Sequence, residues 1–462
     1  MTPPSTDAGA VRRFLPTRDD LQALVRLAVP VATVQVGLLA MGTVDTIMVG
    51  RVSPTDLAAV ALGNLYYFGA SVFGMGVLFA LDPVVAQAVG ADDRPAVARG
   101  VQRGLFLAAI LAGLATLALL PAHPVLAVLR QPPEVVPVAA GYVLASIPGV
   151  FPFYGFVVFR QTLQAMGRVA PIVVVIVLAN VANAFFNWVL IFGNLGLPEL
   201  GAVGTGWASS LSRWCMMLGL AAIGWPLLRD SVRPLRLDAL ALSPLRRLVG
   251  VGAPIGGQQL LEFGVFGAAG LLMGWLGTLS MAAHQVALNL AALTFMVPVG
   301  VAQAASVLVG RAVGREDPAG ARRAAGAGLV VGVVFMACTA ALFLSAPTLL
   351  ARLYSADAPV VAVAAALIPI AGIFQVFDGV QVVASGALRG VGDTRVPMIL
   401  NLVGFWVVGL PVGGALAFGA GMGPQGIWWG LAVGIGVVAV LLLARLHVRF
   451  GRDLRRLVID EE

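Results

Sequence analysis

The stretch that decides the fold is residues 170–193, APIVVVIVLANVANAFFNWVLIFG, in which no side chain is charged. About 20 apolar residues in a helix cross the hydrocarbon core of a bilayer, so this stretch is long enough to span a membrane. Its polar side chains are Asn180, Asn183 and Asn187, whose spacing places all three on one helix face. The stretch therefore predicts a transmembrane helix with one polar face.

Outward from this stretch, similar apolar segments occur along nearly the whole chain. Over 462 residues, 59% are hydrophobic and 11% are charged, whereas a soluble protein carries roughly 25% charged residues. We therefore predict an all-α membrane protein with twelve transmembrane helices. The expected spans are residues 23–47, 57–82, 101–122, 137–160, 170–193, 202–227, 249–275, 281–308, 325–347, 360–386, 396–419 and 425–446.

The charged residues exclude several classes of function. The net charge is +7 and the sequence contains no lysine, which excludes a P-loop and Schiff-base chemistry. We expect no cofactor. The arginines lie in short clusters between apolar segments, which is typical of loops beside anionic lipid and not of a nucleic-acid surface. Cys215 and Cys338 lack metal-site spacing and are expected to pack between helices.

The arginines also predict the orientation in the membrane. If both termini are cytoplasmic, the outer segments keep Arg51, Arg130 and Arg352, and nearly all other arginines fall on the inner side. This asymmetry follows the positive-inside rule. The polar start of the chain favours a solvated tail without a cleavable signal peptide. We expect a multi-pass protein of the bacterial inner membrane with both termini in the cytoplasm.

The two halves of the sequence resemble each other. Three positions recur 224 residues later, since Pro30, Gly76 and Gly90 match Pro254, Gly300 and Gly314. Six helices precede the basic segment that divides the halves, so both copies have the same orientation. Parallel repeats are a transporter architecture with the substrate site between lobes. The expected parts are an N-terminal tail 1–21, an N-lobe 22–227, an inter-lobe linker 228–248, a C-lobe 249–446 and a C-terminal tail 447–462.

Two acids of the second half are candidates for cation coupling. Glu262 lies in the middle of an apolar span with Gln258 one turn earlier, and Asp378 shares its helix face with Gln381. Acids inside a membrane span are functional candidates by default. No arginine of this half is placed to neutralise them, so the pair is expected to hold a proton or to bind Na+. A permanently protonated, structural acid is the alternative.

The first half offers Asp45, a third candidate for cation coupling, together with Asn180, Asn183 and Asn187. The asparagines supply neutral oxygens for a cation or hydrogen bonds for a substrate. Alternatively they tie helices together, and Asp45 lies at the membrane interface.

Three other polar residues are expected to be structural. Asp82 is predicted to be a helix-end or interfacial acid. Arg213 is predicted to snorkel or to pair with a loop acid, with contact to substrate as the alternative. His284 is expected to be hydrogen-bonded and structural.

Several motifs resemble those of multidrug and toxic compound extrusion (MATE) exporters, especially the bacterial NorM-type branch. The resemblance covers residues 22 to 446 in order. Its motifs are Val44-Asp45-Thr46, Val84-Val85-Ala86-Gln87, Phe186-Asn187-Trp188, Glu262-Phe263, the segment 282–289 (AAHQVALN) and the segment 378–390 (DGVQVVASGALRG).

The resemblance implies two six-helix lobes and antiport of amphipathic, mostly cationic drugs against Na+ or H+. It also implies that Glu262 and Asp378 form the cation site of the C-lobe, and that Asp45, Asn183 and Asn187 form the polar cluster of the N-lobe. The partners would be drugs, organic cations and membrane lipid, and we expect a monomer. Asp82 departs from the family, which has an uncharged residue there.

Two alternatives differ in kind from drug export. A flippase for lipid-linked oligosaccharide has the same two-lobe architecture, but it needs a broad basic cavity for pyrophosphate. A membrane-embedded enzyme is disfavoured, because the sequence contains no HExxH motif and no serine–histidine arrangement.

Overall fold

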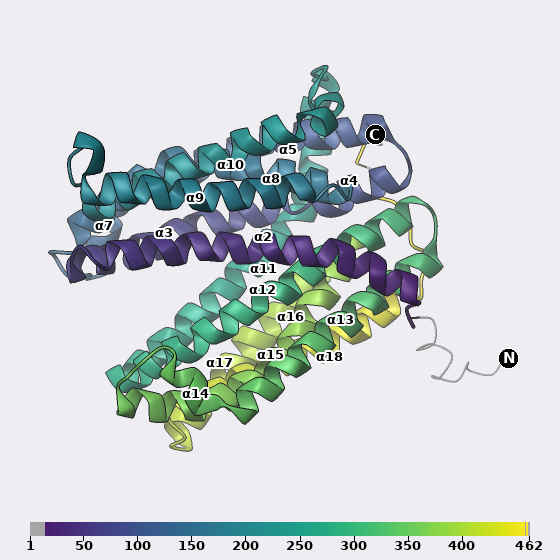
Figure 1. Ribbon diagram of the computed structural model, residues 1–462. Helices are drawn as coiled ribbons and strands as arrows, with labels where there is room; N and C mark the ends of the chain where they lie inside the picture. The colour runs from purple at the N-terminus through teal and green to yellow at the C-terminus, as the bar shows by residue number, and fades with distance from the viewer. Residues whose placement is uncertain (1–13, 458, 461–462) are drawn as a thin grey trace. The chain divides into compact units, whose positions relative to one another are not determined.

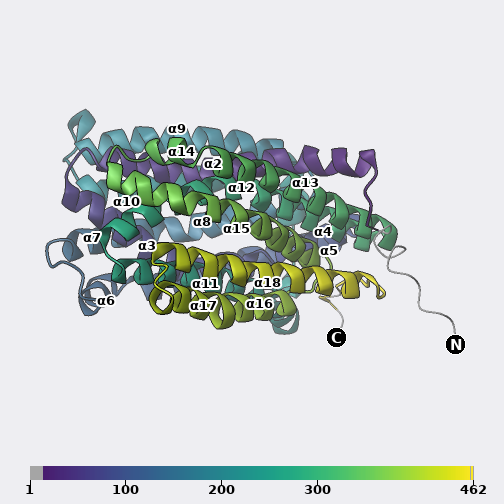
Figure 2. The ribbon, with the colours of Figure 1, turned by 90° about the horizontal axis from the view of Figure 1, so that it is seen from below.

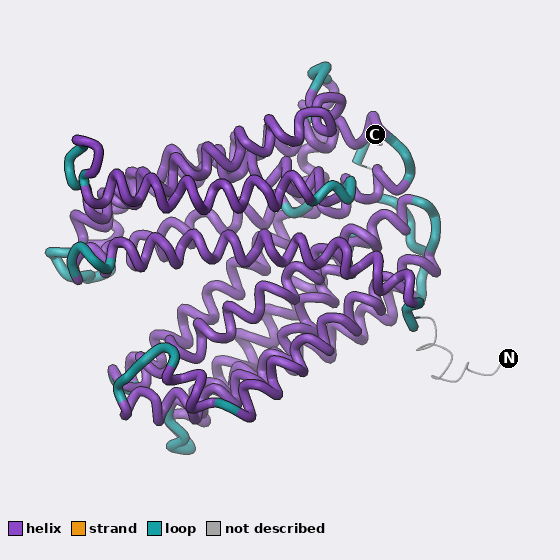
Figure 3. The backbone as a smooth tube through the Cα atoms, in the orientation of Figure 1, coloured by secondary structure: helices purple, strands orange, loops and turns teal. Residues whose placement is uncertain are grey.

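This computed structural model describes residues 14–457 and 459–460, which fold into helices joined by short loops (Figure 1, Figure 3). Within this part there is no β-strand, and the prediction of an all-α protein is confirmed. Of the expected tails, residues 1–13, 458 and 461–462 lie outside the described residues.

The chain divides into two compact units. Among the described residues, the N-unit consists of residues 33–256 and 459–460, and the C-unit of residues 14–32 and 257–457. The helices of the first half are α2 Arg18–Val49, α3 Pro54–Leu78, α4 Leu81–Gly90, α5 Arg94–Leu119, α6 Ala122–Val128, α7 Val136–Ser146, η1 Ile147–Gly149, α8 Val150–Ala165, α9 Ala170–Phe192, η2 Asn194–Gly196, α10 Gly201–Val232 and η3 Leu237–Leu240. Those of the second half are α11 Leu242–Trp275, α12 Thr278–Gly314, α13 Pro318–Ser345, α14 Pro347–Arg352, α15 Ala358–Gly390, α16 Arg395–Asn401, η4 Leu402–Gly409, α17 Leu410–Gly414, η5 Ala415–Gly419 and α18 Pro424–Phe450.

The division between the units falls inside two helices, at equivalent places in the two halves. Helix α2 passes from the C-unit to the N-unit after Ala32, and α11 passes from the N-unit to the C-unit after Gly256. Pro30 and Pro254 stand inside these helices, two residues before each change, and proline removes a backbone hydrogen bond there. The compact units therefore do not end at the expected limits 22 and 249, because each half lends the start of its first helix to the other unit.

Glycine allows the first parts of α2 and α11 to pack closely on neighbouring helices. A Cβ atom on Gly300 of α12 would lie 2.7 Å from the backbone of Ala32, and one on Gly256 of α11 would lie 2.5 Å from the carbonyl oxygen of Phe73. Both distances are too short for any residue with a side chain, and small residues commonly let membrane helices approach in this way. One glycine of the sequence repeat, Gly300, therefore has a direct packing role.

Within each unit, one long helix lies at the centre. In the N-unit, α10 packs against α5, α7, α8 and α9, and in the C-unit, α15 packs against α12, α13 and α18. Figure 2 shows α15 and α18 side by side. These two central helices carry several of the polar side chains that the sequence singles out.

The expected spans are present, although three of them are not single regular helices. In the described part of the chain, eleven helical segments are long and apolar enough to cross a membrane. Helix α11 is not among them, because Gln258, Gln259 and Glu262 interrupt its apolar stretch. Span 57–82 divides into α3 and α4, span 137–160 divides at η1, and span 396–419 alternates between α and π winding.

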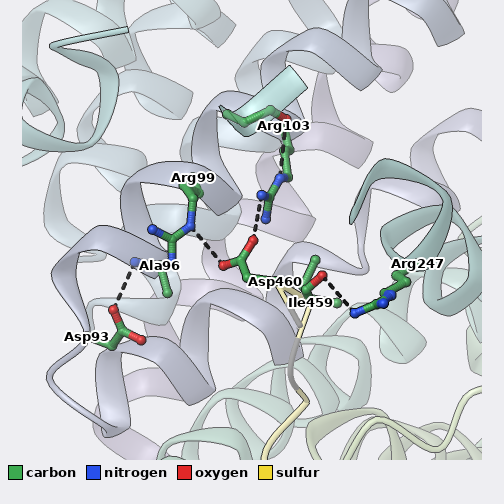
Figure 4. Close-up of polar contacts among 8 residues, drawn as sticks. Asp93, Ala96, Arg99, Arg103, Arg247, Ile459 and Asp460 are labelled. Atoms are coloured by element: carbon green, nitrogen blue, oxygen red, sulfur yellow. Dashed lines mark hydrogen bonds and ion pairs between the residues drawn. The ribbon is translucent and has the colours of Figure 1, made fainter. Parts of the chain in front are cut away.

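The end of the chain belongs to the N-unit, where two arginines of α5 bind it (Figure 4). The Asp460 carboxylate lies 2.8 Å from Arg99 Nε and 2.5 Å from Arg103 Nη2, and Arg247 donates a hydrogen bond to the Ile459 carbonyl oxygen over 3.4 Å. Partial burial raises the pKa of Asp460, but the hydrogen bonds and charges of Arg103 and Arg99 outweigh it, so the net pKa is lowered. Asp460 is therefore ionised near neutral pH.

Candidate functional site

The C-unit contains a buried cluster built on Glu262, in the middle of α11. Gln258, one turn earlier, donates a hydrogen bond to Glu262 Oε1 over 3.0 Å, and Gln381 of α15 donates to the same oxygen over 2.8 Å. Gln381 also donates to Asn401 Oδ1 of α16 over 2.9 Å. Amide groups from two helices therefore hold one carboxyl oxygen, and Asn401 of a third helix accepts from one of these amides.

Asp378 completes this cluster, which we call the C-cluster. It lies three residues before Gln381 on α15, so both side chains share one helix face, and its side chain is 9% exposed. It lies within electrostatic reach of Glu262. Within the described residues, no hydrogen bond to the Asp378 carboxyl group is present. The structure thus brings Glu262 and Asp378 together, although the sequence does not determine their distance.

Little positive charge balances the two acids of the C-cluster. The cation that acts on Glu262 is Arg389, which lies eleven residues beyond Asp378 on α15. That spacing corresponds to roughly 16 Å along a helix axis. In the described part of the chain, no group of three His, Cys, Asp or Glu side chains is placed to hold a metal ion. The cluster therefore offers two carboxyl groups and several amides.

The N-unit contains a second cluster around Asp45 of α2, whose side chain is 7% exposed. Asn183 and Asn187 of α9 donate hydrogen bonds to Asp45 Oδ1 over 3.0 and 2.5 Å, and Ser209 of α10 donates to Oδ2 over 2.8 Å. We call these four residues the N-cluster. Three neutral donors therefore hold a single acid in the interior of the unit.

Ser209 is a member of the N-cluster that the sequence does not single out. It stands among Ser210 and Ser212 on α10, and serines in helices commonly bond to their own backbone, as Ser212 does to the carbonyl oxygen of Ala208. Nothing in the spacing distinguishes the serine that points toward Asp45. It becomes recognisable when α2 and α10 are placed in space.

Asn180 does not join the N-cluster. Its amide donates to the carbonyl oxygen of Gly37 on α2 over 3.1 Å and to that of Ile176 on its own helix over 2.9 Å. In this structure Asn180 ties α9 to α2 through the backbone, one turn before Asn183.

Arg213 of α10 lies next to the N-cluster, and the expectation that it snorkels or pairs with a loop acid is wrong. Its guanidinium carbon stands 4.3 Å from the ring centroid of Tyr67 and 5.8 Å from that of Phe153. It lies within electrostatic reach of Asp45. The aromatic rings hold the arginine inside the unit, where it partly balances the charge of Asp45.

A buried arginine, Arg160, stands inside a helix that continues beyond the expected span 137–160. Arg160 of α8 is expected at the end of a span, but it is 2% exposed and donates to Gln35 of α2 over 2.8 Å. Its electrostatic partner is Asp82 in the first turn of α4, which is 1% exposed. The helix-end position of Asp82 is confirmed.

His284 is fully buried near the start of α12, and its ring centroid lies 5.7 Å from that of Trp428. Within the described residues, neither ring nitrogen has a hydrogen-bond partner. The expectation of a hydrogen-bonded histidine is therefore wrong, and aromatic packing positions the ring instead.

One known family matches the chain twice, once in each half of the internal repeat. A family model described as MatE matches residues 30–189 and again residues 254–413. The second match begins 224 residues after the first, which is the offset between Pro30 and Pro254 in the sequence. The predicted duplication is therefore confirmed over most of both halves.

Full-length bacterial relatives are described as multidrug resistance proteins. The probable multidrug resistance protein NorM of Mesorhizobium japonicum is 39% identical over 453 residues, covering 95% of this chain and 96% of the relative. The multidrug resistance protein PmpM of Pseudomonas aeruginosa is 37% identical, covering 97% of this chain and 95% of the relative. The match therefore extends over both units.

Solved structures share the fold. The eukaryotic MATE transporter AtDTX14 superposes with a TM-score of 0.85 at 22% identity, covering 96% of this chain and 99% of that chain. An outward-facing multidrug resistance MATE family transporter superposes with a TM-score of 0.85 at 20% identity, covering 97% and 99%. The two-lobe membrane fold predicted from the sequence is confirmed.

Proposed function

The chain belongs to the MatE family, and on this premise we propose that it is a secondary transporter that exports amphipathic, mostly cationic drugs in exchange for Na+ or H+. The observation that carries the proposal is the C-cluster, where Glu262 and Asp378 lie together with little positive charge nearby. The family consists of transporters, so the chain is not an enzyme.

The C-cluster supplies a physical reason for coupling. Two ionised carboxyl groups in a poorly solvated site repel each other, so at least one holds a proton or both share a cation. A sodium ion there would take oxygen ligands, which the two carboxylates and the neighbouring amide carbonyls of Gln258 and Gln381 supply. A bound proton or a bound sodium ion reduces the charge that must be buried when the transporter changes conformation.

Binding of the ion and binding of the drug do not need common contacts in the protein. A ligand shifts a conformational equilibrium by its difference in affinity for the two states, so an ion and a drug exchange if each favours a different state. We propose that the C-cluster binds the ion, and that the polar side chains of both units, including Asn180, Asn183, Asn187, Gln258 and Gln381, contact substrate or support its site. In this proposal Asp45 of the N-cluster also takes part in coupling, without being the sole ion site.

Location and orientation follow from the charges and from the bacterial relatives. We propose a multi-pass protein of the inner membrane with both termini in the cytoplasm and lobes 22–227 and 249–446 joined by the linker 228–248, acting as a monomer. A cysteine placed in the linker of a variant without Cys215 and Cys338 should react with an impermeant thiol reagent in inverted vesicles. Reaction in intact cells would reverse the orientation.

The flippase alternative loses support from the charges of the N-unit. A pyrophosphate group needs several uncompensated cations. The two buried arginines of this unit, Arg103 and Arg160, lie beside Asp460 and Asp82, and the half-buried Arg213 lies within electrostatic reach of Asp45. Within the described residues, this unit therefore offers no group of several uncompensated cations.

Transport in proteoliposomes tests the proposed function. Efflux of a lipophilic cation should follow an imposed Na+ gradient or an imposed proton gradient, with the two applied separately. Absence of transport under both gradients by folded, drug-binding protein would contradict it.

A further inference from the structure

The side chain of Arg213 is fixed in the interior of the N-unit by its surroundings. Its guanidinium group lies over the ring of Tyr67 from α3 and near Phe153 from α8. Its aliphatic part passes so close to Gly149 that a Cβ atom there would come within 3.0 Å of Arg213 Cδ. Three neighbouring elements therefore hold the guanidinium group in one place, which is the preorganisation expected of a binding residue.

The guanidinium group is fixed but not satisfied. A guanidinium carries five N–H donors, yet the Nη1 atom of Arg213 is buried without a hydrogen-bond partner. Within residues 14–457 and 459–460, Arg213 makes no ion pair shorter than 4.0 Å. Asp45, the acid within electrostatic reach, already accepts hydrogen bonds from Asn183, Asn187 and Ser209. A half-buried charge with one donor atom shielded from water is costly unless a further group pairs with it.

An anionic group of a ligand is the chemistry that fits this arginine. Guanidinium groups pair with carboxylates through parallel hydrogen bonds, and the ring beneath Arg213 adds an aromatic surface. On the same helix, Ser209 lies one turn away and contacts Asp45, so the interior of the unit presents a cation and an anion close together. A zwitterion matches this pair, with its carboxylate on Arg213 and its positive charge toward Asp45.

We propose that Arg213 is a specificity-determining residue that binds the carboxylate of zwitterionic aromatic substrates, with the ring of Tyr67 beneath it. The proposal rests on the proposed drug export and adds a specificity-determining residue to it. Purely cationic drugs use the transporter without this contact.

The test compares two dyes that differ in one group. Tetramethylrhodamine carries a free carboxylate, and its methyl ester is a monocation with the same ring system. In proteoliposomes under one imposed gradient, Arg213→Gln should lower the ratio of zwitterion transport to ester transport about tenfold, since it removes a charged hydrogen-bond donor. Arg213→Lys keeps the charge but not the paired donors, so its ratio should fall between that of the wild type and that of Arg213→Gln.

A matched control is Arg160→Gln, which removes a buried arginine of the same unit. Its ratio of zwitterion to ester transport should equal that of the wild type, whatever its absolute rates. If Arg213→Gln does not fold, Arg213→Lys and Tyr67→Leu carry the test, and each should lower the ratio.

Three results would overturn the inference. An unchanged ratio in folded Arg213 variants makes the arginine structural. Equal loss of both dyes in Arg213→Gln, restored in the double variant with Asp45→Asn, makes it a counter-charge of Asp45. If the change in the dye ratio caused by Arg213→Gln disappears when gluconate replaces chloride, the site binds an inorganic anion. Failure of the wild type to transport the ester contradicts the proposed export itself, which separates the two failures.

Discussion

The two polar clusters of this transporter are built from the same kinds of residue, but their charges differ. In the N-cluster, one acid, Asp45, accepts hydrogen bonds from three neutral donors and lies within electrostatic reach of Arg213. In the C-cluster, two acids, Glu262 and Asp378, lie within electrostatic reach of each other, and Arg389, about three turns beyond Asp378 along α15, acts on Glu262 alone. The difference indicates that the C-cluster needs a proton or cation to lower its charge, whereas the N-cluster does not.

The largest expected effect comes from removing either acid of the C-cluster. Glu262→Gln and Asp378→Asn keep size and hydrogen bonding but remove the charge that selects the ion. We expect gradient-driven efflux from proteoliposomes to fall at least about a hundredfold, the order by which a lost functional charge commonly lowers a rate. Drug binding to the same purified variants should survive at least in part. Efflux at the wild-type rate in both variants would make the pair structural.

A smaller effect is expected in the N-cluster. Asp45→Asn should lower drug efflux about tenfold, because three donors lose a charged acceptor. The response to the imposed ion gradient should keep its form, since Asp45 is not the sole ion site. The measurement is efflux rate against ion concentration at matched expression. Wild-type efflux would remove Asp45 from the mechanism, and loss of ion dependence would move the coupling site to the N-unit.

Two buried glutamines of α15 provide a matched pair. Gln381 donates to Glu262, whereas Gln375 donates to the carbonyl oxygen of Ala291 and contacts Thr294. Gln381→Leu should raise the ion concentration for half-maximal transport about tenfold. Gln375→Leu should lower thermal stability and leave that concentration near the wild-type value. Equal shifts in both variants would show that Gln381 acts through packing alone.

The smallest effect concerns the end of the chain. The pKa of Asp460 is lowered in the folded protein, so its stabilising contribution is present above the ordinary pKa of aspartate, about 3.9, and is lost as pH falls through the lowered value. Asp460→Asn should remove at most about 1 kcal/mol. The amide protection factor at Asp460 should fall in this variant at pH 7, and in the wild type below about pH 4. Equal protection in both proteins at pH 7 would show that the arginines do not hold this segment.

The helices, the duplication and the acids of the two clusters follow from the sequence, because length, hydropathy and the cost of a buried charge leave local signals. The burial of Arg160 does not follow from the sequence. Its span continues to Ala165, five residues beyond the expected end, because Asp82 and Gln35 from other helices stabilise a polar side chain there. Ser209 and Asn401 are also undetectable locally, since their partners lie far away in the chain.

Ion release on drug binding tests most directly whether the coupling ion belongs to the C-cluster. Tetraphenylphosphonium has no titratable group, so any protons or labelled sodium released when it binds to purified protein come from the transporter. We predict release from the wild type and from Asp45→Asn, and binding without release in the double variant of Glu262→Gln and Asp378→Asn. Undiminished release from that double variant would contradict the account.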